Sequence, residues 1–438
     1  MPNLSVSNEA VGAAEGTGQQ TRSYAGALGI VTTLFFMWGF LTCLNDILVP
    51  HLKSIFDLNY AEVMLVQFAF FGSYFIFSIP SAKLIDLIGY QRSMVVGLLT
   101  MGLGTFLFVP AASVPSFPFF LGALIVLAAG ITCLQVAANP YVTVLGKPQT
   151  ASSRLNLTQA FNSLGTFLAP FFGGVLILSA APKTIQEIRA LAPDALQAYR
   201  LHEAATVKTP YVGLGIALVV LAIAIGISKL PKIEHAQHKV GEKVNDSVWK
   251  HPNLIFGVIA IFVYVGAEVS IGSFLVNYFS QPDIGGLTEK VAASFVAFYW
   301  GGAMVGRFIG SGLLQKIKTG KLLGVCAICA AALVATSMLA SGHVAMWTII
   351  LVGFFNSIMF PSIFTLGVAE LGPLTGDGSG LLIMAIVGGA IIPLTQGWIA
   401  DKIGIHHAFF LPVLCYLYIL FFALSGSKPN SERAAKLA

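Results

Sequence analysis

The chain consists mainly of long apolar runs that are separated by short polar segments. Most runs are about 20 residues long, which is the length that a helix needs to cross the hydrocarbon core of a bilayer. Twelve spans are predicted, at 27–50, 60–85, 93–112, 117–142, 154–179, 210–229, 252–279, 291–314, 321–340, 344–369, 378–400 and 407–425. The pattern therefore predicts an all-α membrane protein with twelve transmembrane helices.

Two longer polar connections interrupt the series of spans. Residues 180–209 are amphipathic with mixed charge, whereas residues 230–250 are basic and follow the sixth span. The second connection is predicted to be a cytoplasmic linker between two six-helix halves. The expected units are a disordered tail (1–24), an N-terminal half (25–229), the linker (230–250), a C-terminal half (251–426) and a second tail (427–438).

The two halves share sequence patterns at equivalent places. A Gly-x4-Pro-x3-Gly pattern occurs at 165–174 in the fifth span and at 388–397 in the eleventh. The fourth and tenth spans each place an amide shortly before a proline, Gln135 before Pro140 and Asn356 before Pro361. Two parallel repeats with a site at their interface are the pattern of the major facilitator fold.

Composition excludes a water-soluble protein. Of the 438 residues 56% are hydrophobic and only 10% are charged, and the mean hydropathy is +0.83. A soluble domain would carry roughly 25% charged residues. The net charge of +5 does not indicate nucleic acid, because the basic residues lie between spans. The positive-inside rule then places both termini in the cytoplasm and the chain in the cell (inner) membrane.

Two acids lie inside predicted spans. Asp46 follows Asn45 deep in the first span, and Glu268 lies in the seventh. A polar side chain at mid-span normally faces the protein interior, a cavity or a partner. Neither acid has a Lys or Arg at similar depth in its own span, so each is expected to take up a proton or to bind a cation. We therefore assign cation coupling to Asp46, Asn45 and Glu268; the alternative is a structural hydrogen bond to a neighbouring helix.

Amide side chains form a second polar group. Gln135 and Asn139 share one face of the fourth span, and Gln159 and Asn162 share one face of the fifth. Asn277 and Asn356 come from the other half. Uncharged groups that donate and accept hydrogen bonds suit the hydroxyls of a sugar. These residues, with Glu268, are the candidate substrate ligands, although any single amide could merely join two helices.

Aromatic residues near these spans offer rings for a sugar. Trp38, Tyr264, Tyr299 and Trp300 could stack against a pyranose face, or could serve only in packing. We include Trp38 among the candidate substrate ligands.

A short charged turn joins the second and third spans. Lys83, Asp86 and Arg92 lie around Gly89, and Arg307 is the expected equivalent in the second half. We predict a cytoplasmic gate here, with ion pairs that break and re-form as the halves move.

Several of these runs resemble one family. The runs are LNDILVP (44–50), QVAANPYVTVLG (135–146), RLNLTQAFNSLG (154–165), YVGAEVSIGSFLVNY (264–278) and FNSIMFPSIFTLG (355–367). They resemble the fucose–galactose–glucose:proton symporter family of the major facilitator superfamily, and are nearer to its glucose/galactose transporters than to the L-fucose permease. The resemblance spans both halves. It implies a plasma-membrane uptake role, a monosaccharide substrate and a monomer.

The resemblance also assigns roles to the acids. The fucose permeases use an aspartate in the N-D-I-L segment for proton coupling, and that position is Asp46. They carry a glutamate where this chain has Gln135, which cannot titrate, and a glutamine where it has Glu268. We therefore hypothesise that Glu268 takes over part of the lost role. Because the acid and the amide have exchanged places, the identity of the coupling ion is open. We favour H⁺; the alternative is Na⁺, which Asp46 could hold with oxygens of Asn45 and Thr42.

The sequence as a whole predicts a secondary active transporter, not an enzyme. We expect import of a hexose, glucose or galactose, by cation symport through alternating access, with no cofactor and no metal centre. Alternatives are a drug or metabolite exporter on the same fold, a membrane glycosyl transferase and a sugar sensor. A transferase would need clustered acidic or basic residues near one interface, and the sequence shows none.

Overall fold

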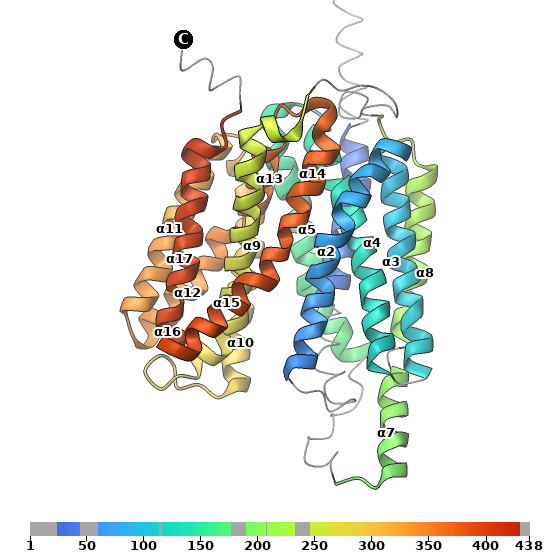
Figure 1. Cartoon of the computed structure of the whole chain (residues 1–438), viewed down its shortest axis with the longest axis vertical. Coiled ribbons are helices and arrows are strands. Elements are labelled where there is room, and N and C mark those ends of the chain that lie inside the picture. Colours follow the sequence, from blue (N-terminus) through green and yellow to red (C-terminus); the bar gives the residue numbers. More distant parts are fainter. Residues whose placement is uncertain are drawn as a thin grey trace, which may run out of the picture.

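The computed structural model describes residues 24–43, 60–113, 116–176, 190–206, 208–232 and 246–429. Within these ranges the chain is almost entirely helical and contains no β-strand (Figure 1). The predicted tails and most of the predicted linker lie outside the described residues.

The N-terminal half contains a first helix, Tyr24–Cys43, followed by α2 (Tyr60–Ile88), α3 (Tyr90–Ser113), α4 (Phe117–Val144), α5 (Ala151–Leu176), the short α7 (Pro193–Thr206) and α8 (Lys208–Ile227). The C-terminal half contains α9 (Pro252–Phe279), α10 (Glu289–Leu313), α11 (Thr319–Leu339), α12 (Gly342–Asn356), α13 (Met359–Gly367), η4 (Gly372–Leu374), α14 (Thr375–Met384), η5 (Ala385–Val387), α15 (Gly388–Ile403), α16 (Ile405–Ala408), α17 (Phe410–Phe421) and η6 (Phe422–Gly426). In the described part of the chain, 11 helical segments are long and apolar enough to cross a membrane. With α5, they match the predicted spans, and the all-α membrane fold is confirmed.

The tenth span differs from the prediction because it is broken. α12 ends at Asn356 and α13 begins at Met359. Pro361 has no N–H to donate to the carbonyl of Ser357, four residues earlier. That carbonyl instead accepts a hydrogen bond from Arg307 Nε, at 3.3 Å. Pro140 occupies the equivalent place in α4, yet α4 continues as one helix to Val144, so only the C-terminal repeat breaks.

The repeated glycines mark two close helix crossings. A Cβ atom on Gly165 of α5 would lie 2.3 Å from the carbonyl oxygen of Phe36 in the first helix. A Cβ atom on Gly388, at the start of α15, would lie 2.0 Å from the carbonyl oxygen of Phe262 in α9. The same pattern therefore lets backbones touch at equivalent crossings in both halves.

The two halves contact each other at one end of the bundle, which we call the closed end. There Ser152 and Thr365 share a hydrogen bond of 2.6 Å, Ser153 donates to the Ser311 carbonyl at 2.7 Å, and Lys83 Nζ lies 3.4 Å from Asp377. The helices of the two halves converge at this end and diverge toward the other, the far end (Figure 1).

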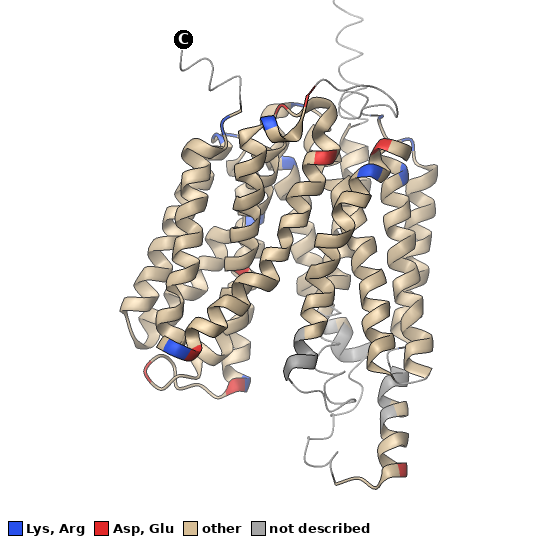
Figure 2. Ribbon diagram, in the orientation of Figure 1, with Lys and Arg blue, Asp and Glu red and all other residues tan. Residues whose placement is uncertain are grey.

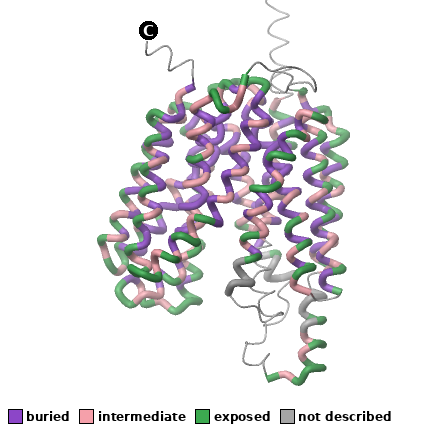
Figure 3. Tube along the Cα trace, in the orientation of Figure 1, coloured by how far each residue is buried: buried purple, intermediate pink, exposed green. Residues whose placement is uncertain are grey.

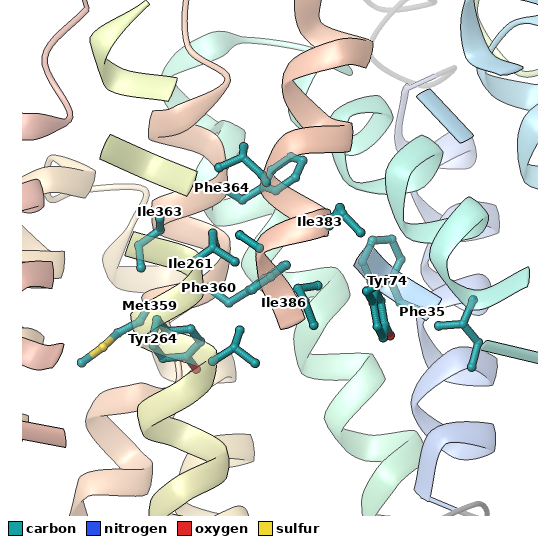
Figure 4. Packing of buried hydrophobic residues seen from close by; sticks show 14 of the residues in the cluster. Phe35, Tyr74, Ile261, Tyr264, Met359, Phe360, Ile363, Phe364, Ile383 and Ile386 are labelled. Carbon is teal, nitrogen blue, oxygen red and sulfur yellow. The ribbon is translucent and has the colours of Figure 1, made fainter. Parts of the chain in front are cut away.

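An apolar layer adds to the contact between the halves. Ile383 of α14 and Ile386 of η5 lie between Phe360 of α13 and Tyr74 of α2 (Figure 4). Each of these side chains is at most 8% exposed, and buried residues concentrate where the helices of the two halves converge (Figure 3).

Basic residues gather at the closed end (Figure 2). Lys83, Arg92, Lys147, Lys229, Lys232, Lys250, Lys316, Lys318, Lys321 and Lys428 lie at helix ends or in connections on that side. At the far end Arg200 lies on α7, Lys208 and Lys290 lie at the starts of α8 and α10, and Lys402 lies near the end of α15. The charge distribution of the described residues is therefore strongly asymmetric along the bundle.

The crossing at Gly388 yields a stability prediction. We expect Gly388→Ala to lower the thermal unfolding temperature of the purified protein in detergent. The added methyl group would collide with the Phe262 carbonyl, and overpacking of this kind costs ~1–3 kcal/mol. The matched control is Gly397→Ala in the same helix, where the nearest atom to a Cβ is Phe274 Cζ at 3.5 Å. Equal unfolding temperatures for the two variants would contradict the assignment.

Candidate functional site

Three of the four candidate amides of the N-terminal half, Gln135, Asn139 and Gln159, keep unused hydrogen-bonding capacity. Gln135 Nε2 donates to the Tyr74 hydroxyl at 2.6 Å, and Asn162 Nδ2 donates to the Phe35 carbonyl at 2.9 Å. Gln135 Oε1, both amide atoms of Asn139 and Gln159 Nε2 are buried and have no hydrogen-bond partner among the described residues. A buried polar atom without a partner costs ~1–3 kcal/mol, so this group of amides is suited to receive a polar ligand.

A network of three tyrosines surrounds the acid of the C-terminal half. Tyr264 donates to Glu268 Oε1 at 2.8 Å, and both residues lie on α9. Asn356, the last residue of α12, donates through Nδ2 to the Tyr299 hydroxyl of α10 at 2.8 Å. Its Oδ1 accepts from the Tyr416 hydroxyl of α17, also at 2.8 Å. The network thus joins four helices and holds both Glu268 and Asn356 in place.

Arg307 lies between these two groups. It was expected at the cytoplasmic edge, but it lies within α10 and is half-buried. Its guanidinium donates to the Ser163 hydroxyl and to the Gln159 carbonyl at 3.5 Å, both on α5. It also attracts the Glu268 carboxylate electrostatically. Arg307 comes from α10 and Glu268 from α9, so the pattern within the span of either acid could not pair the two residues.

Other candidate ligands lie outside these two groups. Asn277 is exposed near the end of α9, on the opposite side of the helix from Glu268, since nine residues correspond to about two and a half turns. Trp300 is 41% exposed. Trp38, by contrast, lies beside the amides: it is partly exposed and hydrogen-bonds to the Tyr74 hydroxyl, which also accepts from Gln135.

Two of the aromatic candidates, Tyr264 and Tyr299, were candidates for stacking against a sugar but are buried in the helix bundle. Tyr264 and Tyr299 are fully buried, and their hydroxyls are engaged in the network around Glu268 and Asn356. Neither ring offers an open face, so the structure places both behind the polar groups.

The first coupling candidates lie outside the described residues. Asp46 and Asn45 follow the last described residue of the first helix, Cys43. Thr42, which was considered as a sodium ligand, is described, and its buried Oγ1 has no hydrogen-bond partner among the described residues.

Two of the predicted gate residues, Lys83 and Asp86, lie against the other half. Lys83 pairs with Asp377 of α14, and the two side chains are 63% and 22% exposed. Asp86 lies close by, since its Oδ1 would be 3.7 Å from a Cβ on Gly376. Arg92 is exposed on α3. An exposed pair of this kind contributes at most about 1 kcal/mol, so closure of this end also depends on the buried hydroxyl contacts between the halves.

Some residues of the site were not found from the sequence. Asn156 on α5 donates to the Arg307 carbonyl at 2.6 Å and to Ser311 Oγ at 3.1 Å. Its position continues the three-residue spacing of Gln159 and Asn162, which could have revealed it. Tyr74 and Tyr416 lie in runs of apolar and aromatic residues, where nothing distinguishes them.

The comparisons with known proteins identify the class. Residues 28–386 match the Major Facilitator Superfamily. The chain belongs to this superfamily and is a multi-pass membrane transporter, not an enzyme.

Three similar proteins within this class are named as sugar transporters. The chain is 54% identical to the glucose/galactose transporter of Brucella abortus, over 93% of this chain and 95% of that protein. It is 47% identical to a putative glucose/galactose transporter of Helicobacter pylori, over 93% and 98%. It is 36% identical to the L-fucose-proton symporter of Escherichia coli, over 97% and 98%.

A solved structure agrees with this grouping. The Escherichia coli fucose:proton symporter superposes with a TM-score of 0.86 at 34% identity, over 93% of this chain and all of that chain. A structure of that transporter in the outward conformation gives the same score.

The position of Arg307 predicts a conformational effect. We expect Arg307→Gln to loosen the closed end, because the guanidinium joins α10 to α5 across the two halves. Spin labels at Lys147 and Lys318, exposed on opposite halves at this end, would then report a new population at longer distance. The native cysteines are replaced in all samples. Lys316→Gln, which removes an exposed charge one turn beyond α10, is the control and should leave the distances unchanged. Unchanged distances in Arg307→Gln would contradict the bridging role.

Proposed function

We propose that this chain imports a hexose, glucose or galactose, across the inner membrane by symport with H⁺. The transport cycle is alternating access: the two halves open to one side at a time around a site between them. The protein needs no cofactor and is expected to act as a monomer.

The observation that carries the proposal is the set of unpaired amides on α4 and α5. Gln135, Asn139 and Gln159 together offer buried donors and acceptors without protein partners in the described part of the chain. Sugar hydroxyls both donate and accept, so they can satisfy such atoms. A lipophilic drug could not, which argues against an exporter. The names of the relatives, which transport glucose, galactose or fucose, support the same substrate class.

The orientation follows from charge. The closed end carries most of the described basic residues (Figure 2), and basic residues concentrate on the cytoplasmic side of membrane proteins. The closed end is therefore proposed to face the cytoplasm, with both termini on that side. The structure then represents a state that is open outward, as in the matched symporter structure.

Coupling is assigned to Asp46 and Glu268. Glu268 is partly exposed, it lies on α9 in the half opposite the amides, and Tyr264 fixes one of its oxygens. A proton on this carboxyl would remove a charge that is costly to enclose when the halves close over the sugar. Arg307 offsets part of that charge beforehand and bonds to the Gln159 carbonyl and the Ser163 hydroxyl of α5.

One observation supports Na⁺ as the coupling ion in place of H⁺. Thr42 Oγ1 is buried at the end of the first helix without a hydrogen-bond partner in the described ranges, a few residues before Asp46. An oxygen in this position, together with Asn45 and Asp46, is the kind of ligand that Na⁺ takes. Sodium symport is therefore the alternative.

Sugar counterflow in proteoliposomes tests the substrate assignment. We expect exchange of radiolabelled D-glucose or D-galactose in the wild type, and a KM about three- to tenfold higher in Gln135→Ala, the usual effect of losing one hydrogen bond. Gln91→Ala is the control, because Gln91 Nε2 already donates to the Ile225 carbonyl of α8 and to the Ser228 carbonyl just after that helix. Failure to exchange either hexose would refute the assignment, and an unchanged KM in Gln135→Ala would remove that amide from the site.

A further inference from the structure

The phenolic hydrogen of Tyr264 faces two acceptors. Its hydroxyl oxygen lies 2.8 Å from Glu268 Oε1 and 3.1 Å from the main-chain carbonyl of Asn356. A tyrosine hydroxyl has one hydrogen to donate, so it cannot serve both acceptors fully. Tyr264 is completely buried, which keeps bulk water from supplying the missing bond. The charge on Glu268 therefore decides where the hydrogen points, since a carboxylate is a much stronger acceptor than a neutral group.

The second acceptor lies at the break of the tenth span. Asn356 is the last residue of α12, and Ser357 and Ile358 separate it from α13. The Asn356 side chain is clamped by Tyr299 and Tyr416, and the Ser357 carbonyl accepts from Arg307. At this junction it is therefore the Asn356 carbonyl whose hydrogen-bond donor, the Tyr264 hydroxyl, also bonds to the Glu268 carboxylate.

We propose that Tyr264 is a positioning residue that transmits the charge of Glu268 to the junction between α12 and α13. When Glu268 is ionised, the hydroxyl donates to the carboxylate. When Glu268 takes up a proton from the aqueous phase and becomes neutral, the hydroxyl turns its hydrogen to the Asn356 carbonyl. Tyr264 itself loses no proton; it only changes its acceptor. The inference rests on the proposed function, because it takes Glu268 as a coupling acid.

Among the described groups around Glu268, Tyr264 is the one whose side chain bonds to the carboxylate, so it can respond to a change in the charge of Glu268. From α10, Arg307 and Tyr299 face the acid, and from α17 Tyr416 contributes to the same network. The hydrogen bonds of Arg307 go to α5 and to Ser357, not to the carboxylate of Glu268. Tyr299 and Tyr416 bond to the Asn356 side chain, not to the carboxylate of Glu268.

A residue that served only in packing would affect accumulation and counterflow together. The test therefore compares Tyr264→Phe with the wild type, with Glu268→Gln and with a control variant. Tyr416→Phe is the matched control: it also removes a fully buried hydroxyl from the Asn356 clamp, but one that does not bond to Glu268. Phenylalanine keeps each packed ring, and sugar counterflow shows that each variant is folded.

The measurement is hexose accumulation in proteoliposomes under an imposed pH gradient, divided by counterflow of the same hexose. We expect Tyr264→Phe to lower this ratio about tenfold, the usual effect of losing a hydrogen bond to a charged group. Glu268→Gln, which removes the titrating group, should lose accumulation and keep counterflow, and Tyr264→Phe should show the same pattern in a weaker form. Tyr416→Phe should change accumulation and counterflow in proportion.

Two different failures can be told apart. If Tyr264→Phe keeps the wild-type ratio, or lowers accumulation and counterflow in proportion as Tyr416→Phe is expected to do, Tyr264 does not transmit the state of Glu268 and this inference alone is overturned. If the wild-type protein exchanges no hexose at all, the proposed function is overturned and the inference with it.

Discussion

In the hydrocarbon of a bilayer a backbone carbonyl has to find its hydrogen-bond donor within the protein. Pro140 and Pro361 have no N–H, so each leaves the carbonyl four residues earlier without its helical donor. In α4 that carbonyl accepts from Ser379 of the other half, at 2.8 Å. In the tenth span it accepts from Arg307, at 3.3 Å. The contact between the halves and the shape of the polar site both depend on how these two freed carbonyls are satisfied.

The two halves divide the chemistry of the site. The N-terminal half presents amides with unpaired atoms, which suit a neutral ligand of many hydroxyls. The C-terminal half holds one carboxyl, Glu268, in a fully buried frame of tyrosines, which suits a change of charge at a fixed place. Arg307 connects the two, because its guanidinium bonds to α5 while it attracts the acid. A substrate on the amides and a cation on the acid can therefore influence each other over a short distance.

The features of this structure that depend on local residue spacing could be predicted from the sequence. Apolar runs gave the spans, and the repeated glycines at 165 and 388 correspond to equivalent crossings because only glycine lets the backbones touch there. The sequence alone could not place Arg307 beside α5, since that contact depends on how the two halves pack. Nor could it separate Tyr416 from the aromatic residues around it. The break at Asn356 was also missed, because an almost identical pattern before Pro140 leaves α4 intact.

The most direct test of the account is uptake of radiolabelled D-glucose into proteoliposomes under a pH gradient or a sodium gradient, imposed separately. The wild type and Glu268→Gln are compared, and counterflow shows that both are active. The account predicts that the pH gradient concentrates glucose in the wild type, that the sodium gradient does not, and that Glu268→Gln exchanges sugar without concentrating it. Near-normal accumulation in Glu268→Gln, or glucose exchange that neither gradient drives in the wild type, would contradict it.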